Sequence, residues 1–286
     1  AMEEAGRDVI HMELGEPDFD TPRPMVEAGV AALEAGHTHY TPAKGLRALR
    51  EAISEHYAVD HGLDVPAQRV IVTPGASGAL QLVMGVLVDP GDQVLLADPG
   101  YPCNRHFVRL ADGEPVAVPV DSASAYQLSA EAVRGHAGPD TRVVLVGSPS
   151  NPTGTVIAPE ELAAIHRETW QRDAFLVVDE IYQGLTYGGA DHCALALGED
   201  PLVVNSFSKY YGMTGWRVGW VVAPEYLVPE LDRLAQNIFI SAPTAAQHAA
   251  LAAFSPAARE VLEARRQAFR QRRDFLVPAL KDLGFR

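Results

Sequence analysis

The sequence has few of the residues that would indicate a disulfide framework, a metal centre or a membrane span. It has two cysteines, Cys103 and Cys193, and neither lies in a CxxC or Cys/His spacing that binds zinc. No apolar run approaches the roughly 18 residues that suggest a membrane helix. The first residues lack the basic segment and apolar stretch of a signal peptide. We therefore expect a cytoplasmic protein without a metal site.

Basic residues are also scarce. The chain carries 23 Lys and Arg against 37 Asp and Glu, a formal charge of −14, whereas nucleic-acid binding ordinarily requires a basic surface. The signatures GxGxxG and GxxxxGK[ST] are absent after any candidate strand, which removes the main support for dinucleotide or nucleoside-triphosphate chemistry. The 286 residues, 47% of them hydrophobic, suffice for one large domain or two unequal ones.

Short β-branched runs alternate with longer helical patterns from about residue 68 onward. Several of these runs are apolar without in/out alternation, which is typical of strands covered by helices on both faces. The pattern predicts an α/β fold with a mostly parallel seven-stranded sheet and helices on both faces. The candidate strands are residues 69–73, 93–97, 115–120, 142–147, 175–179, 202–205 and 218–223.

Helical spacing occurs between these strands and on either side of them. Leu46, Leu49, Ile53 and Tyr57 recur at intervals of three and four residues and are expected to face the core from one helix. The other candidate helices are residues 77–88, 129–134, 159–171, 225–236, 245–254 and 256–283.

A glycine-rich turn, TPGASGAL at residues 73–80, joins the first candidate strand to a helix. Such a turn points backbone N–H groups, here those of Ala76 and Ser77, at an anion, and the helix dipole adds to the attraction. Taken alone, the pattern also fits an ordinary turn with Ser77 as the helix cap.

Lys209 directly follows another apolar strand, close to Ser206, Ser208 and Arg217. A lysine amine can attack a carbonyl while the hydroxyls and the guanidinium bind an anion. Ser206 and Lys209 also match the SxxK of penicillin-recognising serine enzymes, but the KTG and SDN partners of that motif are absent. A surface lysine is the remaining alternative.

Asp179 and Asn151 also follow candidate strands. A carboxylate at the end of a buried strand is costly unless a cation pairs with it, so Asp179 is interpreted as functional. Asn151 lies in a loop that two prolines and a glycine make rigid, SPSNPTG at residues 148–154. By itself that loop would be interpreted as a turn.

Together, these segments resemble the pyridoxal-phosphate-dependent aminotransferases of classes I and II, which have the type I fold. The resemblance extends in order from Gly15 to Arg217. It is carried by the turn at residues 73–80 and by GEPDF at 15–19, YTPxxG at 40–45, DPGYP at 98–102, SNPTG at 150–154, VDEIY at 178–182 and SFSK at 206–209.

The resemblance implies pyridoxal 5′-phosphate as the cofactor and three catalytic residues. Lys209 would bind the cofactor as a Schiff base and would carry a proton between the substrate Cα and the cofactor. Asp179 would pair with the pyridine nitrogen and keep it protonated, because a cationic ring acts as the electron sink. Tyr182, together with Asn151, would hydrogen-bond the ring 3′ oxygen.

The resemblance also implies a phosphate site and a second subunit. Tyr101 would stack on the ring, and Tyr40 would reach the phosphate of the neighbouring subunit's cofactor, which implies a homodimer with shared active sites. Gly15 and Asn151 are candidate contacts for the substrate carboxylate. The phosphate contacts would be Ser206, Ser208, Arg217 and the N–H groups of Ala76 and Ser77.

The implied function is transfer of an amino group from an L-amino acid to a 2-oxo acid. A carbon–sulfur β-lyase of the same fold is an alternative, because the motifs near the cofactor do not separate the two reactions. A regulatory aminotransferase-like domain is a third hypothesis. It would require a basic helix-turn-helix segment, and none is found.

The resemblance suggests three parts of the chain. Residues 1–39 would contribute to a small domain, 40–240 would form the large cofactor-binding domain, and 241–286 would begin the C-terminal small domain. Members of the family usually continue past the equivalent of Gly284 to an arginine that binds the substrate α-carboxylate. No arginine after residue 256 matches that pattern, so we expect the chain to represent part of the protein.

Overall fold

A seven-stranded sheet forms the centre of the protein in a computed structural model that describes residues 2–11, 15–188 and 192–285. The strand order is β1-β7-β6-β5-β4-β2-β3. The neighbours from β6 to β3 are parallel, and β7 runs antiparallel to both β6 and β1. The predicted fold class is therefore confirmed. The strands are β1 (Val70–Thr73), β2 (Gln93–Asp98), β3 (Glu114–Pro119), β4 (Thr141–Gly147), β5 (Phe175–Asp179), β6 (Leu202–Ser206) and β7 (Gly219–Val222).

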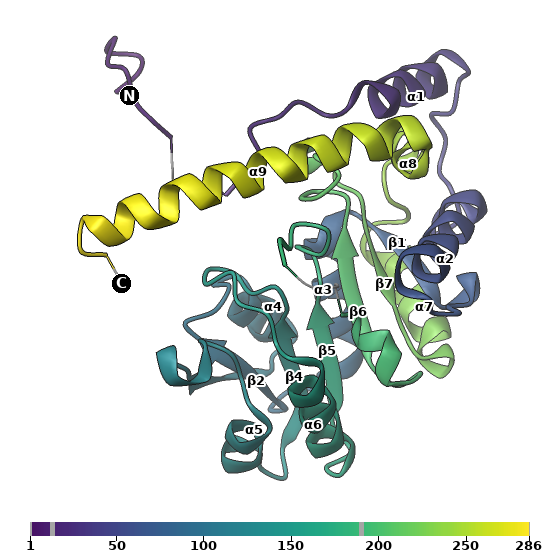
Figure 1. Ribbon diagram of the computed structural model, residues 1–286. Coiled ribbons are helices and arrows are strands. Elements are labelled where there is room, and N and C mark those ends of the chain that lie inside the picture. Colours follow the sequence, from purple (N-terminus) through teal and green to yellow (C-terminus); the bar gives the residue numbers. More distant parts are fainter. Residues whose placement is uncertain (1, 12–14, 189–191, 286) are drawn as a thin grey trace.

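Helices cover both faces of this sheet (Figure 1). Helices α3, α4 and α7 contribute to the core on one face, and α2, α5, α6 and α8 to the core on the other. The helices are α1 (Arg23–Glu34), α2 (Arg47–His61), α3 (Gly75–Leu87), α4 (Asn104–Leu110), α5 (Ala130–His136), α6 (Pro159–Trp170), α7 (Val228–Ile238), α8 (Thr244–Leu251) and α9 (Pro256–Asp282).

The apolar strands explain the two cores. Successive side chains of a strand point to opposite faces. Accordingly, Val70 and Val72 of β1 pack in one core and Ile71 in the other. An apolar residue at every position of such a strand therefore indicates burial on both faces, as the sequence predicted.

The helical stripe on α2 enters the core as expected. Leu49, Ile53 and Tyr57 have no exposed surface, and Leu46, which precedes the helix, is partly buried. The hydroxyl of Tyr57 accepts a hydrogen bond of 3.0 Å from the indole N–H of Trp220 in β7, so both buried polar groups are satisfied.

Two helices, α1 and α4, were not predicted. The buried positions of α1 are Met25, Gly29 and Ala32, and two of these are too small to produce a clear hydrophobic period. Helix α4 has 7 residues, which is too short to establish one.

Helix α9 is 27 residues long and lies across one end of the molecule (Figure 1). Its first turns pack on the core through Ala258 and Leu262, whereas its second half is largely exposed. Within the described residues, no helix combines the length and the apolar character that crossing a membrane requires. The predicted division into segments 1–39, 40–240 and 241–286 stays a prediction.

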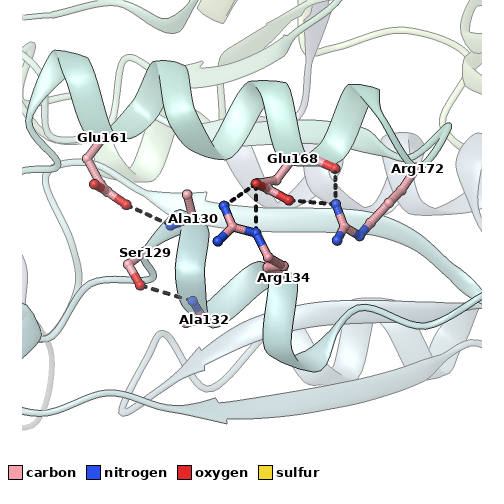
Figure 2. A network of polar contacts seen from close by, with 7 residues as sticks. All are labelled: Ser129, Ala130, Ala132, Arg134, Glu161, Glu168 and Arg172. Carbon is pink, nitrogen blue, oxygen red and sulfur yellow. Dashed lines mark hydrogen bonds and ion pairs between the residues drawn. The ribbon is translucent and has the colours of Figure 1, made fainter.

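A polar network joins α5 to α6 (Figure 2). Glu168 of α6 accepts hydrogen bonds from Arg134 Nε at 3.0 Å and from Arg172 Nη1 at 2.7 Å. Glu161 accepts one from the backbone N–H of Ala130 at 2.6 Å. The contacts of Glu161 with Ala130 and of Glu168 with Arg134 hold α5 against α6.

The N-cap of α5 provides a stability test. Ser129 Oγ accepts a hydrogen bond of 3.0 Å from the backbone N–H of Ala132. We expect Ser129→Ala to lower the free energy of unfolding by about 1 kcal/mol, because a helix N–H loses its partner. Urea denaturation monitored by circular dichroism measures the change. Ser241→Ala, at a serine whose hydroxyl bonds no described residue, is the matched control, and equal loss in both variants would contradict the capping role.

Candidate active site

The predicted site residues converge at the carboxyl edge of the sheet. Asp179 ends β5 and Ser206 ends β6, and Gly219 at the start of β7 is paired with both Ser206 and Thr73. The turns after these strands surround a cavity of about 330 Å³. Of the predicted residues, Gly15, Ala76, Ser77, Tyr101, Asn151, Asp179, Tyr182, Ser208, Lys209 and Arg217 line it.

Ser206 and Tyr40 do not line this cavity. Ser206 is buried, its Oγ lies 2.9 Å from Ser208 Oγ, and it accepts a hydrogen bond of 3.0 Å from the Ser208 backbone N–H. Ser206 therefore positions Ser208 from behind. Tyr40 is 79% exposed at the surface. Its predicted contact with a neighbouring subunit stays a prediction.

One end of the cavity is built to hold an anion. Helix α3 begins at Gly75, so Ala76 and Ser77 belong to its first turn, and Ser77 is not the cap. N–H groups of a first helical turn have no partner within the helix and carry a partial positive charge. Arg217 adds a full positive charge at the same place, and its Nη1 donates to the Thr214 carbonyl at 2.9 Å.

Gly75 is required by this arrangement. Its φ is +72°, a conformation that favours glycine, and a Cβ at this position would lie 2.4 Å from Arg217 Nη2. The turn and the Arg217 guanidinium therefore lie so close together that a side chain at residue 75 would clash.

Asp179 lies in the cavity with little to stabilise its charge. Its Oδ1 accepts one hydrogen bond of 3.1 Å, from the backbone N–H of Ile181. Burial raises the pKa of Asp179 to about 6, opposed by that bond. Among the described residues no cation pairs with it, so a positively charged group in the cavity would find an unpaired carboxylate.

Lys209 faces the same cavity. Burial lowers the pKa of its amine, with the Glu16 carboxylate acting in the opposite direction. Its Nζ donates a hydrogen bond of 2.6 Å to the Gly15 carbonyl and lies 5.7 Å from the centre of the Tyr182 ring. A lysine with a lowered pKa has more of the neutral, nucleophilic form at neutral pH.

Tyr101, Asn151 and Tyr182 line the same cavity as Asp179 and Lys209. Asn151 Nδ2 donates to the Tyr182 hydroxyl at 3.1 Å, and burial raises the pKa of Tyr182. A hydrogen bond with the Cys103 thiol and burial raise the pKa of Tyr101 to about 12. Both tyrosines are therefore neutral hydrogen-bonding groups at ordinary pH.

The segment at residues 15–21 brings Gly15 to Lys209. Thr21 Oγ1 donates to the Gly212 carbonyl at 2.9 Å, Glu16 hydrogen-bonds Thr214, and Asp18 pairs with Arg272 of α9 at 2.7 Å. Glu16 and Thr214 also line the cavity, as do Leu80 and Ile181, and none of these was predicted. Glu16, Leu80 and Ile181 lie inside the motifs at residues 15–19, 73–80 and 178–182, and Thr214 lies between Lys209 and Arg217, so nearness to these residues was the available signal.

Comparison with known proteins identifies the family. The model of the family "Aminotransferase class I and II" matches residues 7–286. The chain belongs to this family. It is an aminotransferase enzyme.

Relatives agree with this membership over nearly the whole chain. The aminotransferase is 38% identical to an aspartate aminotransferase of Geobacillus stearothermophilus, over 99% of this chain and 74% of the relative. It is 39% identical to a valine–pyruvate aminotransferase of Mycobacterium tuberculosis, over 97% and 72%. The structure of Thermus thermophilus aspartate aminotransferase with maleate has a TM-score of 0.95 at 36% identity, and the match covers 100% of this chain and 75% of that one. The predicted type I fold is confirmed.

The raised pKa of Asp179 predicts a pH-dependent stability. The folded state binds this proton more tightly than the unfolded state, so stability decreases as pH rises from about 4 to about 6. Above that window, the ionised Asp179 carboxylate lowers the free energy of unfolding of the aminotransferase when no cofactor is bound. We expect Asp179→Asn to raise its free energy of unfolding at pH 8 by on the order of 2 kcal/mol, and the gain to vanish near pH 4.

Urea denaturation at the two pH values measures this gain. Asp140→Asn, at an exposed aspartate, is the matched control. A gain for Asp179→Asn that is the same at both pH values would show that ionisation is not its cause.

Proposed function

We propose that this enzyme uses pyridoxal 5′-phosphate to transfer an amino group from an L-amino acid to a 2-oxo acid, with Lys209 as the residue that binds the cofactor covalently. The observation that carries the proposal is a single cavity shared by the Lys209 amine, the unpaired Asp179 carboxylate and the anion-binding end at Ala76, Ser77 and Arg217. Relatives named aspartate and valine–pyruvate aminotransferase support amino acids and 2-oxo acids as substrates.

The donor set fits the chemical groups of this cofactor. A phosphate needs several N–H or O–H donors and a positive charge, and the helix terminus, Ser208 and Arg217 offer them. A pyridinium nitrogen needs a carboxylate, an aldehyde needs an amine, and Asp179 and Lys209 offer these. The cavity volume of about 330 Å³ lies within the usual range for small-molecule sites.

Each part of the chain then has a defined role. Ser208 and Arg217 hold the phosphate, with Ser206 fixing the Ser208 rotamer. Asp179 pairs with the ring nitrogen, Tyr101 packs on the ring face, and Asn151 with Tyr182 donates to the ring oxygen. When bound, pyridoxal phosphate supplies an electron sink for the pair left at the substrate Cα.

Lys209 moves the proton in this proposal. Burial favours the neutral form of the Lys209 amine, which would accept a proton from the substrate Cα and donate it to the cofactor. The Gly15 carbonyl, 2.6 Å from Nζ, orients the amine for this transfer. Gly15 and Asn151 are also proposed to contact the substrate carboxylate.

The proposal includes a homodimer in which Tyr40 contacts the phosphate in the partner subunit. An exposed tyrosine outside its own chain's cavity is compatible with such a contact. The cytoplasmic location expected from the sequence stays a prediction.

The identity of the cofactor-binding lysine is directly testable, because the chain has just Lys44, Lys209 and Lys281. We expect incubation with pyridoxal phosphate and then borohydride to attach the pyridoxyl group to Lys209, since of these three lysines, all within the described residues, only Lys209 lines the cavity. Peptide mass mapping locates the label. Lys44 and Lys281 are internal controls within the same chain.

A variant extends this test. Lys209→Ala removes the amine and should abolish both the label and the visible absorbance of the bound cofactor. Label spread evenly over the lysines, or a borohydride-reducible chromophore that persists in Lys209→Ala, would refute the assignment.

Subunit mixing tests the proposed role of Tyr40. Tyr40→Ala should weaken cofactor retention and lower activity, and Lys209→Ala should be inactive. In a mixed dimer, the subunit with Lys209 receives an intact Tyr40 from its partner, so one of the two sites is complete. Amino transfer should therefore recover when the two variants are unfolded together and refolded. Tyr40→Phe is the matched control for loss of the hydroxyl alone.

The recovery has a clear contrary outcome. If Tyr40 acts within its own subunit, every site of the mixed dimer lacks one of the two residues. The mixture would then show no more activity than the two variants measured apart, and the shared-site proposal would be wrong.

A further inference from the structure

Trp216, the residue before Arg217, is held by the N-terminal part of the chain. Its indole Nε1 donates a hydrogen bond of 3.0 Å to Thr21 Oγ1, across 195 positions of the sequence. The same Thr21 hydroxyl donates a hydrogen bond of 2.9 Å to the Gly212 carbonyl. Thr21 therefore uses both its acceptor and its donor on the two ends of residues 212–216, which directly precede Arg217.

Helix α1 packs against the ring of the same tryptophan. A Cβ on Gly29, in the middle of this helix, would lie 2.6 Å from Trp216 Cη2 and 2.7 Å from its Cζ3. The ring is partly buried and packs against the core cluster that includes Met25 of the same helix. The position of the indole is thus fixed by a hydrogen bond at one edge and by close packing against α1.

Arg217 depends on such support because its backbone conformation is unfavourable by itself. Its φ is +55°, in the left-handed region that residues with a side chain disfavour. Residues in this conformation persist where the surrounding structure holds them on both sides. Val218, which follows, is buried and leads into β7, so the sheet fixes one side of Arg217. Trp216 fixes the other side.

We propose that Thr21 is a positioning residue for Arg217: its two hydrogen bonds hold the preceding turn, and with it the guanidinium, where the phosphate of the cofactor binds. The inference deepens the proposed function, on which it rests, because the phosphate is the anion assigned there to Arg217. The guanidinium lies directly against Gly75, so a shift of its backbone changes how it and the N–H groups of α3 meet an anion.

The segment at residues 15–21 then restrains both ends of the cavity. Gly15, at its start, accepts the hydrogen bond from the Lys209 amine, and Thr21, at its end, holds the turn before Arg217. Pyridoxal phosphate is proposed to bond the amine through its aldehyde and the guanidinium through its phosphate. The two protein groups that bind this one ligand therefore both depend on the same segment.

The test compares pyridoxal phosphate with pyridoxal, which lacks the phosphate. The ratio of their dissociation constants, measured by absorbance titration, gives the preference for the phosphorylated form. Thr21→Val keeps the shape of the side chain and removes its donor and its acceptor. We expect it to weaken the binding of pyridoxal phosphate about tenfold and that of pyridoxal less than about twofold, because a displaced Arg217 affects the phosphate alone. Thr21→Ser keeps the hydroxyl and should restore the preference.

Gly29→Ala moves the same ring without altering the hydroxyl, and it supplies an independent measurement if Thr21→Val does not fold. Its Cβ would overlap the indole, so Trp216 must shift, and the preference for pyridoxal phosphate should decrease. Two matched controls should leave the preference unchanged. Thr169→Val removes a hydroxyl that donates to a backbone carbonyl at 2.7 Å, and Gly135→Ala adds a Cβ in open space on α5.

The proposal is overturned if the folded Thr21→Val and Gly29→Ala proteins both keep the preference of the unaltered protein. Inorganic phosphate, titrated by calorimetry, separates this outcome from failure of the proposed function. If pyridoxal phosphate does not label Lys209 but Thr21→Val binds inorganic phosphate about tenfold more weakly, the cofactor assignment fails and the positioning role stands. Labelled Lys209 with an unchanged preference in both variants gives the reverse conclusion. If the unaltered protein binds neither compound, both proposals fail.

Discussion

The site depends on one constraint: a carboxylate is held at the end of a buried strand with no cation of the described chain beside it. Parallel pairing of β5 with β4 and β6 places Asp179 at the edge where the turns meet. Burial then raises its pKa to about 6. An unpaired buried carboxylate lowers the stability of the protein alone and favours the binding of a positively charged group in the cavity.

At the other end of the cavity, Arg217 is likewise held without an ion pair to the described chain. Arg217 lies so close to Gly75 that a Cβ there would fall 2.4 Å from its guanidinium. Its Nη1 is held by the Thr214 carbonyl, and it forms no ion pair with a carboxylate of the described chain. Its charge and the N–H groups of α3 therefore remain available to an anion. Backbone geometry, rather than an opposite charge, keeps the arginine in place.

The strands and most of the residues that line the cavity were predictable because their signals are local. β5 begins and ends at Phe175 and Asp179 as its apolar run predicted, and the functional groups follow such runs directly. The contacts of Gly15 with Lys209 and of Asp18 with Arg272 join residues 194 and 254 positions apart. No spacing rule connects such residues, because their contacts depend on how the segment at 15–21 packs against residues 209–214 and α9.

Ser206 shows a second limit of sequence reasoning. The resemblance to the family implied a direct phosphate contact for this residue. In the structure Ser206 is buried outside the cavity and hydrogen-bonds Ser208, which lines the cavity. Composition and periodicity do not record which of two neighbouring serines faces a ligand and which one supports the other.

The opposite shifts of Asp179 and Lys209 explain why the cavity remains reactive. Burial raises the pKa of the acid and lowers that of the amine. A direct ion pair would reverse both shifts and leave neither group free for a ligand. Nζ is instead bound to the Gly15 carbonyl and Asp179 to the Ile181 N–H, two neutral backbone groups. These neutral partners hold the two side chains in place without neutralising their charges. The Gly15 carbonyl binds the Lys209 amine less strongly than a carboxylate would, so the segment at residues 15–21 leaves the amine available to react.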